Sequence, residues 1–184
     1  MKKVLFGGAL FLILIAAVWL SVNAINDGEF NKWSHPTVSE EHFDNGKRVY
    51  LGYNFTWEGI GRPTIIQLDF IKKDGTPLAG ADAYRIQPYV EMSRDGNTIG
   101  AMDEETVIDE GKLDYLTPLG NTQVDGDFRI VLRVDYDGVQ IDDDIGEMII
   151  TYTKFGVTRH QMIPFDGILM DDSRPVNRYG SARS

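Results

Sequence analysis

The chain of 184 residues contains no cysteine. This absence excludes disulfides, thiol nucleophiles, haem attachment through cysteine and thiolate metal sites. It also excludes a lipoprotein, because no thiol after the N-terminal apolar run could accept a lipid. We therefore expect a folded part that depends on its hydrophobic core alone. Since disulfides are common in oxidising compartments, their absence hints at a bacterial cell surface.

Cations are few, with 18 lysine and arginine residues against 28 acidic residues and a formal net charge of −10. Lys2 and Lys3 precede the apolar run, so the rest of the chain carries 16 cations against 28 anions, a net charge of −12. A body of this charge is repelled by nucleic acid and by anionic lipid headgroups. The composition excludes a general polyanion binder and is compatible with cations, sugars or protein partners.

Recognisable catalytic motifs are absent as well. The sequence has no Gly-x-Ser-x-Gly elbow and no glycine-rich phosphate loop. Ser34 and His35 are adjacent in the chain, which is a poor arrangement for a nucleophile and its base. Paired carboxylates could hydrolyse a glycoside, but among so many acids no pair stands out. We therefore expect no enzyme and keep a cell-wall glycan hydrolase as an alternative.

The sequence does contain one long uncharged run, residues 4–22, between Lys2-Lys3 and the acids Asp27 and Glu29. As a helix, this run measures about 28 Å, close to the hydrocarbon thickness of a bilayer. The flanking charges orient the N-terminus inward and the remainder outward. We expect residues 1–24 to be a membrane anchor, which makes a single-pass protein of the cell membrane with its C-terminal domain outside. A signal peptide cleaved after Ala24 is the alternative and would give a secreted protein.

Beyond this run, large apolar side chains recur at every second position. The pattern is clear in residues 51–57 and 128–136, and Ile66, Leu68 and Phe70 repeat it. A period of two is typical of a strand with one buried face. Short strands separated by Asp-Gly turns, without a helical period, predict an all-β sandwich or barrel, and of these we expect a β-sandwich.

The same patterns divide the chain. We expect a stalk or loosely packed lead-in over residues 25–46, the β-sandwich domain over 47–166, and a disordered tail over 167–184. The lead-in is polar and irregular, and the tail is rich in Ser, Arg and Gly. Residues 93–126 show only weak strand signals, so their role as an insertion, a lid or part of the sheet stays open.

Two segments resemble bacterial surface modules. Residues 70–81, Phe-Ile-Lys-Lys-Asp-Gly-Thr-Pro-Leu-Ala-Gly-Ala, combine a strand end, an Asp-Gly turn and a Pro-Leu-x-Gly-Ala entry into the next strand. Residues 124–130 contain a similar strand entry, Gly-Asp-Phe-Arg-Ile. Both are similar to bacterial immunoglobulin-like and transthyretin-like surface modules. The resemblance implies an immunoglobulin-like β-sandwich used for display, adhesion or assembly, and it carries no catalytic residues.

Candidate binding residues lie at the end of the first predicted strand and in the loop after it. Tyr53 and Trp57 could stack a sugar ring, although so regular an alternation is also what a buried core face shows. The glycine-rich residues 58–62 form a loop in which Glu58 and Arg62 could contact a partner. Arg62 would meet an anionic group there.

Candidate metal ligands form an acidic segment whose carboxylates suit Ca²⁺. They are Asp135, Asp137, Asp142, Asp143 and Asp144. Their spacing does not fit the helix–loop–helix calcium motif, and a solvated connection between strands is the alternative. His35 and His42, with acids between them, could bind zinc or copper or belong to an exposed lead-in.

Together these features predict a non-enzymatic, membrane-tethered extracytoplasmic β-sandwich that binds or assembles with another cell-envelope component. The expected partners are the membrane, through the N-terminal helix, and an envelope protein or glycan, with no nucleic acid. Ca²⁺ is the one cofactor considered. A metal-binding module organised by calcium, or else by copper or zinc, is the alternative.

Overall fold

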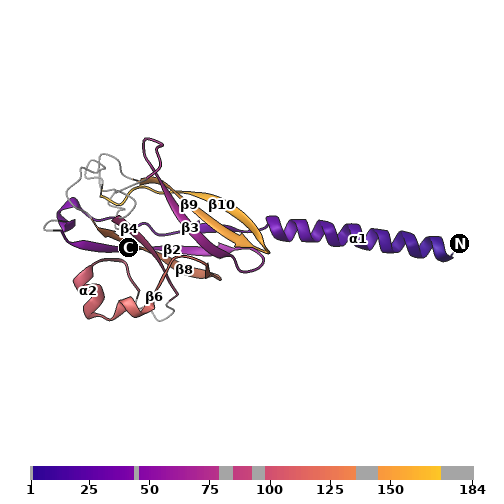
Figure 1. Cartoon of the computed structure of the whole chain (residues 1–184), viewed down its shortest axis with the longest axis horizontal. Helices are drawn as coiled ribbons and strands as arrows, with labels where there is room; N and C mark the ends of the chain where they lie inside the picture. Colours follow the sequence, from indigo (N-terminus) through magenta and orange to yellow (C-terminus); the bar gives the residue numbers. More distant parts are fainter. Residues whose placement is uncertain (1, 44–45, 79–84, 93–97, 136–144, 171–184) are drawn as a thin grey trace, which may run out of the picture.

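The computed structural model describes residues 2–43, 46–78, 85–92, 98–135 and 145–170, without the side chains of residues 2–10 and 40 (Figure 1). The described residues are mostly β, and their strands form two antiparallel sheets, an arrangement consistent with a β-sandwich. The all-β prediction is confirmed at this level. A long helix, α1 (Lys2–Asn26), extends from one end of the sandwich.

The first sheet contains β1, β2, β8, β4 and β6 in this order, with β5 also paired to β2. Its strands are β1 (Glu29–Lys32), β2 (Arg48–Glu58), β8 (Asp127–Asp135), β4 (Ile86–Glu91), β6 (Leu116–Pro118) and β5 (Ala101–Asp103). The second sheet has the order β10, β9, β3 and β7. Its strands are β10 (Val157–Pro164), β9 (Ile145–Lys154), β3 (Thr64–Lys72) and β7 (Thr122–Gln123).

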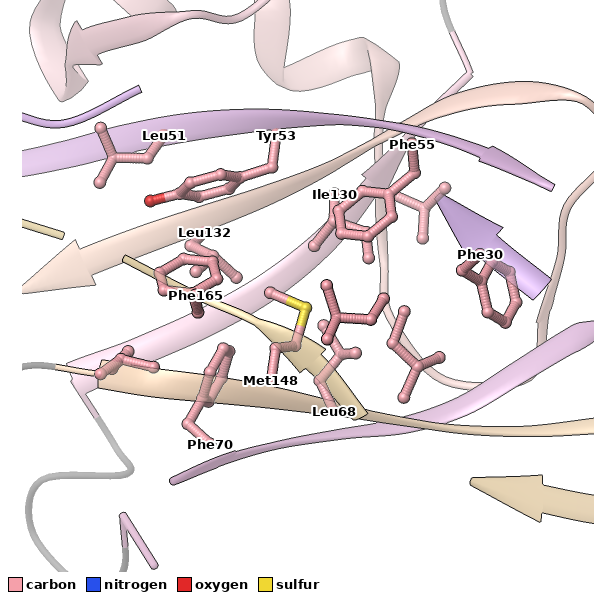
Figure 2. Packing of buried hydrophobic residues seen from close by; sticks show 14 of the residues in the cluster. Phe30, Leu51, Tyr53, Phe55, Leu68, Phe70, Ile130, Leu132, Met148 and Phe165 are labelled. Atoms are coloured by element: carbon pink, nitrogen blue, oxygen red, sulfur yellow. The ribbon is translucent and has the colours of Figure 1, made fainter. Parts of the chain in front are cut away.

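The core lies between the two sheets and is almost entirely apolar (Figure 2). The alternation expected in β2 is confirmed, because the side chains on its inner face are at most 5% exposed: Val49, Leu51, Tyr53, Phe55 and Trp57. Ile130 and Leu132 of β8 extend this face, and the opposite sheet contributes Phe70, Met148 and Phe165 (Figure 2). Burying one such side chain stabilises the fold by about 1.5–3 kcal/mol. A cysteine-free domain is held together in this way.

The inward residues of β3 differ from the expectation. Ile65, Leu68 and Phe70 are buried, whereas Ile66 is only partly buried. The register of β3 against β9 shifts between Ile65 and Gln67. An irregularity of this kind breaks the alternation of side chains along a strand, so a simple period of two assigned Ile66 to the wrong face.

Residues 29–43 pack against the sandwich and are not a loosely packed lead-in. β1 pairs with β2, and Phe30 is 2% exposed in the core. Val38 is buried, as is Phe43 at the end of the 3-10 helix η1 (Glu40–Phe43). Isolated apolar residues in a polar segment show no period, and only their burial reveals that the domain begins before the predicted boundary at residue 47.

The C-terminal boundary of the domain also differs from the predicted one at residue 166. Val38 forms a parallel bridge with Leu169, and Ile168 is buried in the core. The domain therefore includes residues 167–170, which the sequence assigned to the tail. Residues 171–184 lie outside the described residues.

Residues 98–118, here named the excursion, lie between β4 and β8 and cover the outer face of the first sheet. They contain β5, the short helix α2 (Glu104–Asp109), the 3-10 helix η3 (Lys112–Tyr115) and β6. A second apolar cluster forms beneath them from Tyr50, Ile99, Val107 and Val131. The excursion, which lies within the segment 93–126 of weak strand signals, thus contributes two strands to the first sheet and also covers part of its outer face.

No helix in the part of the chain that the structure describes is long and apolar enough to cross a membrane.

Candidate functional site

The most elaborate set of contacts joins the end of α1 to two loops of the sandwich. We name this region the helix-proximal rim. It comprises residues 26–28 at the end of α1, the β2–β3 loop 58–62 and the β9–β10 turn 154–157. Figure 1 shows both loops at the end of the sandwich from which α1 extends. The predicted binding loop therefore lies beside the helix.

Lys154, the last residue of β9, is the central cation of the rim. Its side chain points inward and the residue is 2% exposed. The ammonium group donates a hydrogen bond to the backbone carbonyl of Asp27 and lies 5.1 Å from the ring centre of Trp57. Burial lowers the pKa of Lys154, because the charged form loses hydration. A cation at the carboxyl end of a helix also complements the helix dipole of α1.

Two side chains of β10, Arg159 and Gln161, also form hydrogen bonds with the N-terminal segment. Arg159 donates a hydrogen bond to the side chain of Asn26. The Gln161 amide accepts a hydrogen bond from the Phe30 N–H at 2.7 Å and donates one to the Phe30 carbonyl at 2.8 Å. The Gln161 side chain thus forms the two hydrogen bonds that a neighbouring strand would form with the backbone of Phe30. These bonds hold the end of α1 and the strand β1 against β10.

The glycines of the β2–β3 loop allow a close approach to the α1–β1 connection. The Trp57 indole donates to the Gly61 carbonyl at 2.8 Å, and the Ile60 N–H donates to the Asp27 carboxylate at 2.7 Å. A Cβ atom at Gly28, where φ is +100°, would lie 2.4 Å from the Trp57 ring. Glycine is required there by both space and backbone conformation.

The β9–β10 turn has an unusual residue at its tip. Phe155 and Gly156 have φ values of 52° and 78° and connect residues paired as Lys154 and Val157. Two positive φ values in a two-residue hairpin loop mark a type I′ turn, which favours Asn-Gly. Phe155 is nevertheless present and 56% exposed, and Ile60 in the adjacent loop is 58% exposed. The rim therefore ends in two exposed apolar side chains.

The predicted binding residues separate into two groups. Tyr53 is fully buried and Trp57 is 5% exposed, so neither ring offers a face to a sugar, and the core interpretation of their alternation holds. Glu58 is exposed. Arg62 is exposed and pairs with Asp125 at 2.9 Å. Glu58 and Arg62 are accessible to a partner, and their predicted contact with one stays a prediction.

The predicted calcium ligands lie mostly outside the described residues, which include Asp135 but not Asp137, Asp142, Asp143 and Asp144. The Asp135 carboxylate is 3.0 Å from the Arg48 guanidinium, so it already has a cationic partner. In the described ranges, no group of three histidine, cysteine or acidic residues could hold a metal ion. The calcium site stays a prediction.

The two histidines considered for zinc or copper make different contacts. His35 packs against Tyr53 and Phe165, its Nε2 donates to the Gly167 carbonyl at 2.8 Å, and its Nδ1 lies 2.9 Å from the Lys32 ammonium. An ammonium group can only donate, so the imidazole is neutral with its proton on Nε2. His42 bonds to Ser39 at 2.8 Å. His35 is therefore a structural residue of the β1–β10 side of the sandwich.

A second group of charges lies under the excursion on the outer face of the first sheet. Glu91 is 1% exposed, pairs with Arg129 at 3.1 Å and accepts a hydrogen bond from the Ile99 N–H. Arg133 and Arg48 both pair with Glu104 of α2, at 3.0 and 3.1 Å. These charges neutralise each other and attach the excursion to the sheet.

The same face carries a shallow pocket of about 200 Å³. Its lining residues are Gly46, Lys47, Arg48, Asp103, Glu104 and Glu105. Arg48 and Glu104 are paired with each other, and the Asp103 carboxylate accepts a hydrogen bond from the Thr106 N–H at 2.8 Å. Three of the polar groups around the pocket are thus engaged in structural contacts.

Sequence reasoning missed Lys154 and Phe155 as members of the rim. One signal was present, since Phe-Gly occupies a two-residue hairpin connection where Asn-Gly is expected. The contact of Lys154 with Asp27 joins residues 127 positions apart and has no local signal.

Comparisons of this chain with protein-family models, with curated proteins and with solved structures each found no match. The function is therefore argued from the molecule itself.

Proposed function

We propose that this protein is a non-enzymatic, membrane-tethered extracytoplasmic β-sandwich that binds or assembles with another component of the cell envelope. One observation carries the tether. The large apolar side chains described in α1 over residues 11–22 are all 50–67% exposed: Phe11, Leu12, Ile13, Leu14, Ile15, Val18, Trp19, Leu20 and Val22. They surround the helix on every side, and a helix of this kind needs an apolar environment. For residues 4–10 the proposal relies on the sequence alone.

The polar side chains near the end of α1 support the same proposal. The Ser21 hydroxyl donates to the Ala17 carbonyl at 2.8 Å, and the Asn23 amide donates to the Trp19 carbonyl at 3.0 Å. Both use a carbonyl one turn earlier in the same helix. Such internal bonds satisfy polar groups where water is scarce, as in a bilayer.

The connectivity supports an immunoglobulin-like sandwich. The orders β1-β2-β8-β4 and β10-β9-β3 correspond to the ABED and GFC sheets of constant-type immunoglobulin domains. The excursion is then an insertion between the fourth and fifth strands. In this proposal the sandwich serves as a binding module, and its inserted segment covers the outer face of the ABED sheet.

The remaining surface is where a partner is expected to bind. The excursion already covers one sheet, whereas β10 exposes Met162, at 55%, and His160 on the outside of the other. The loop residues Glu58 and Arg62 are accessible as well. With a net charge of −12 outside the N-terminal segment, the domain favours a neutral or cationic partner surface.

Two measurements test the proposed anchoring by α1: alkaline washing of native membranes and the intact mass of the protein. The full chain should stay with native membranes during alkaline carbonate washing and should keep residues 1–24 in its intact mass. Lysines at Ile13 and Ile15, near the middle of the run, should prevent this retention, because a lysine at the centre of a membrane helix costs about 2.5–3.5 kcal/mol. Ile108→Lys, an exposed isoleucine on α2, is the matched control.

Two outcomes contradict parts of the proposal. An intact mass without residues 1–24 would identify a secreted protein. Chemical crosslinking in native membranes that repeatedly recovers the chain alone would remove the proposed envelope partner while leaving the tether in place.

A further inference from the structure

We infer that the helix-proximal rim rests on the lipid surface, with Ile60 and Phe155 inserted among the headgroups of a zwitterionic bilayer. This inference rests on the proposed anchoring by α1. It adds a second contact between the protein and the membrane, which would hold the sandwich at a set height and angle.

The position of the rim follows from the length of α1. The apolar run ends at Val22 and the helix ends at Asn26. Four residues of helix span about 6 Å. The headgroup region of each leaflet is about 5–7 Å thick. If the run fills the hydrocarbon core, the end of α1 and the loops bonded to it lie at headgroup depth.

The two exposed side chains have the chemistry for this depth. Phe155 packs on Gly61, where an added Cβ would lie 2.6 Å from the ring, so Phe155 is adjacent to the loop that carries Ile60. The left-handed conformation of Phe155 is strained for a bulky residue, and Asn would suit the turn better. Residues strained in this way cluster at functional sites, which supports a role for the exposed Phe155 ring outside the fold.

Three polar groups next to these tips already have hydrogen-bond partners. The Ile60 N–H, the Trp57 indole and the Lys154 ammonium all have acceptors within the rim. Transfer into the headgroup region therefore leaves none of these three groups without a hydrogen bond. The charge of −12 carried by residues 4–184 opposes anionic lipid, so the expected surface is zwitterionic.

The absence of cysteine makes a direct test possible on the full chain. Single cysteines introduced by Ile60→Cys and Phe155→Cys would carry a polarity-sensitive fluorophore, with the protein reconstituted into phosphatidylcholine vesicles. Leu14→Cys reports on α1 itself. Ile108→Cys is the matched control, because this isoleucine is 54% exposed on α2, at the far end of the sandwich (Figure 1).

Labels at residues 14, 60 and 155 should emit at shorter wavelength and lose intensity when the lipid chains are brominated, whereas the label at residue 108 should not. Quenching at residue 14 alone would overturn the rim contact and leave the anchor standing. No quenching at residue 14 would overturn the anchor and the rim contact together. Equal quenching at residues 60, 155 and 108 would show general adsorption and also overturn the rim contact.

A second variant separates lipid contact from a structural role of Phe155. Phe155→Asn supplies the residue that a type I′ turn prefers. It should leave the melting temperature unchanged or higher and reduce the quenching of a label at residue 60. A lower melting temperature with unchanged quenching would assign Phe155 to the stability of the fold and overturn its role at the membrane.

Discussion

The two faces of the β2–β8 strand pair are both covered, but by different chemistry. The inner face carries Leu51, Phe55 and Ile130, and it packs on the second sheet through apolar contacts. The outer face combines a small apolar cluster with two arginines, Arg129 and Arg133, which pair with Glu91 of β4 and Glu104 of α2. The inner face stabilises the fold through the area removed from water, whereas the outer face depends on the position of single atoms. The two faces should therefore respond differently to substitution.

The largest loss of stability is expected for a substitution on the inner face. Phe55→Ala removes a fully buried ring that stacks on Phe128 with centroids 5.7 Å apart. Loss of such a ring costs about 3–5 kcal/mol of unfolding free energy, because a cavity remains. Denaturant unfolding of the full chain in detergent measures it. The neighbouring Thr56→Ala on the outer face should cost about 1 kcal/mol or less. Equal losses would contradict the division between the two faces.

The second largest loss of stability is expected when the buried ion pair of the outer face is broken. Arg129→Met leaves the Glu91 carboxylate, 1% exposed, without its guanidinium partner. A buried charge left in this way costs about 3 kcal/mol. The double variant Glu91→Gln with Arg129→Met should recover most of the loss, because no unpaired charge remains. Denaturant unfolding measures both variants.

The exposed pair of the same face provides the control. Arg48 and Glu104 have side chains that are 43% and 27% exposed. Arg48→Met should change stability little, since solvent screens exposed charges. A loss as large as that of Arg129→Met would show that exposure does not decide the strength of these pairs.

The smallest loss of stability is expected when Asp103, the N-terminal cap of α2, is replaced. The Asp103 carboxylate accepts hydrogen bonds from the Thr106 side chain and N–H, and these bonds lower the pKa of Asp103 below its ordinary value. Its contribution to stability is therefore present above the ordinary pKa and is lost as the pH falls through the lowered one. Asp103→Ala should lower the melting temperature less than Arg129→Met and accelerate hydrogen exchange in the excursion.

The pH dependence provides the check on this cap. At neutral pH the wild type should be more stable than Asp103→Ala, and the difference should shrink as the solution is acidified below the ordinary pKa of an aspartate. A difference that stays constant through this range would mean that the charge of Asp103 does not contribute.

The sequence predicted the inner face well because its signal is local. In β2 and β8 every second side chain is large and apolar, and this period directly reports which side of a strand is buried. The same reasoning failed for Ile66, because a register shift interrupts the period. It also missed Phe30, Val38 and Phe43, since single apolar residues in a polar segment carry no period.

The candidate site was predicted only in part. The glycines of residues 58–62 identified a loop, and the apolar run identified a helix, but nothing local placed them together. Their contact depends on the bonds of Ile60 to Asp27 and of Lys154 to Asp27, which join residues 33 and 127 positions apart. The excursion was left open for a related reason. A helix of six residues is too short to show a period, and it is held by ion pairs with other strands.

The sequence by itself determined the class of the fold, the absence of disulfides and thiol chemistry, the negative charge and the long apolar run. These are properties of composition and of spacing over a few residues. Only the tertiary structure decided that the N-terminal segment belongs to the sandwich, that Arg129 lies opposite a buried Glu91, and that Ile60 and Phe155 share the end from which α1 extends. Each depends on contacts between distant parts of the chain, and a pattern of spacing over a few residues does not report such contacts.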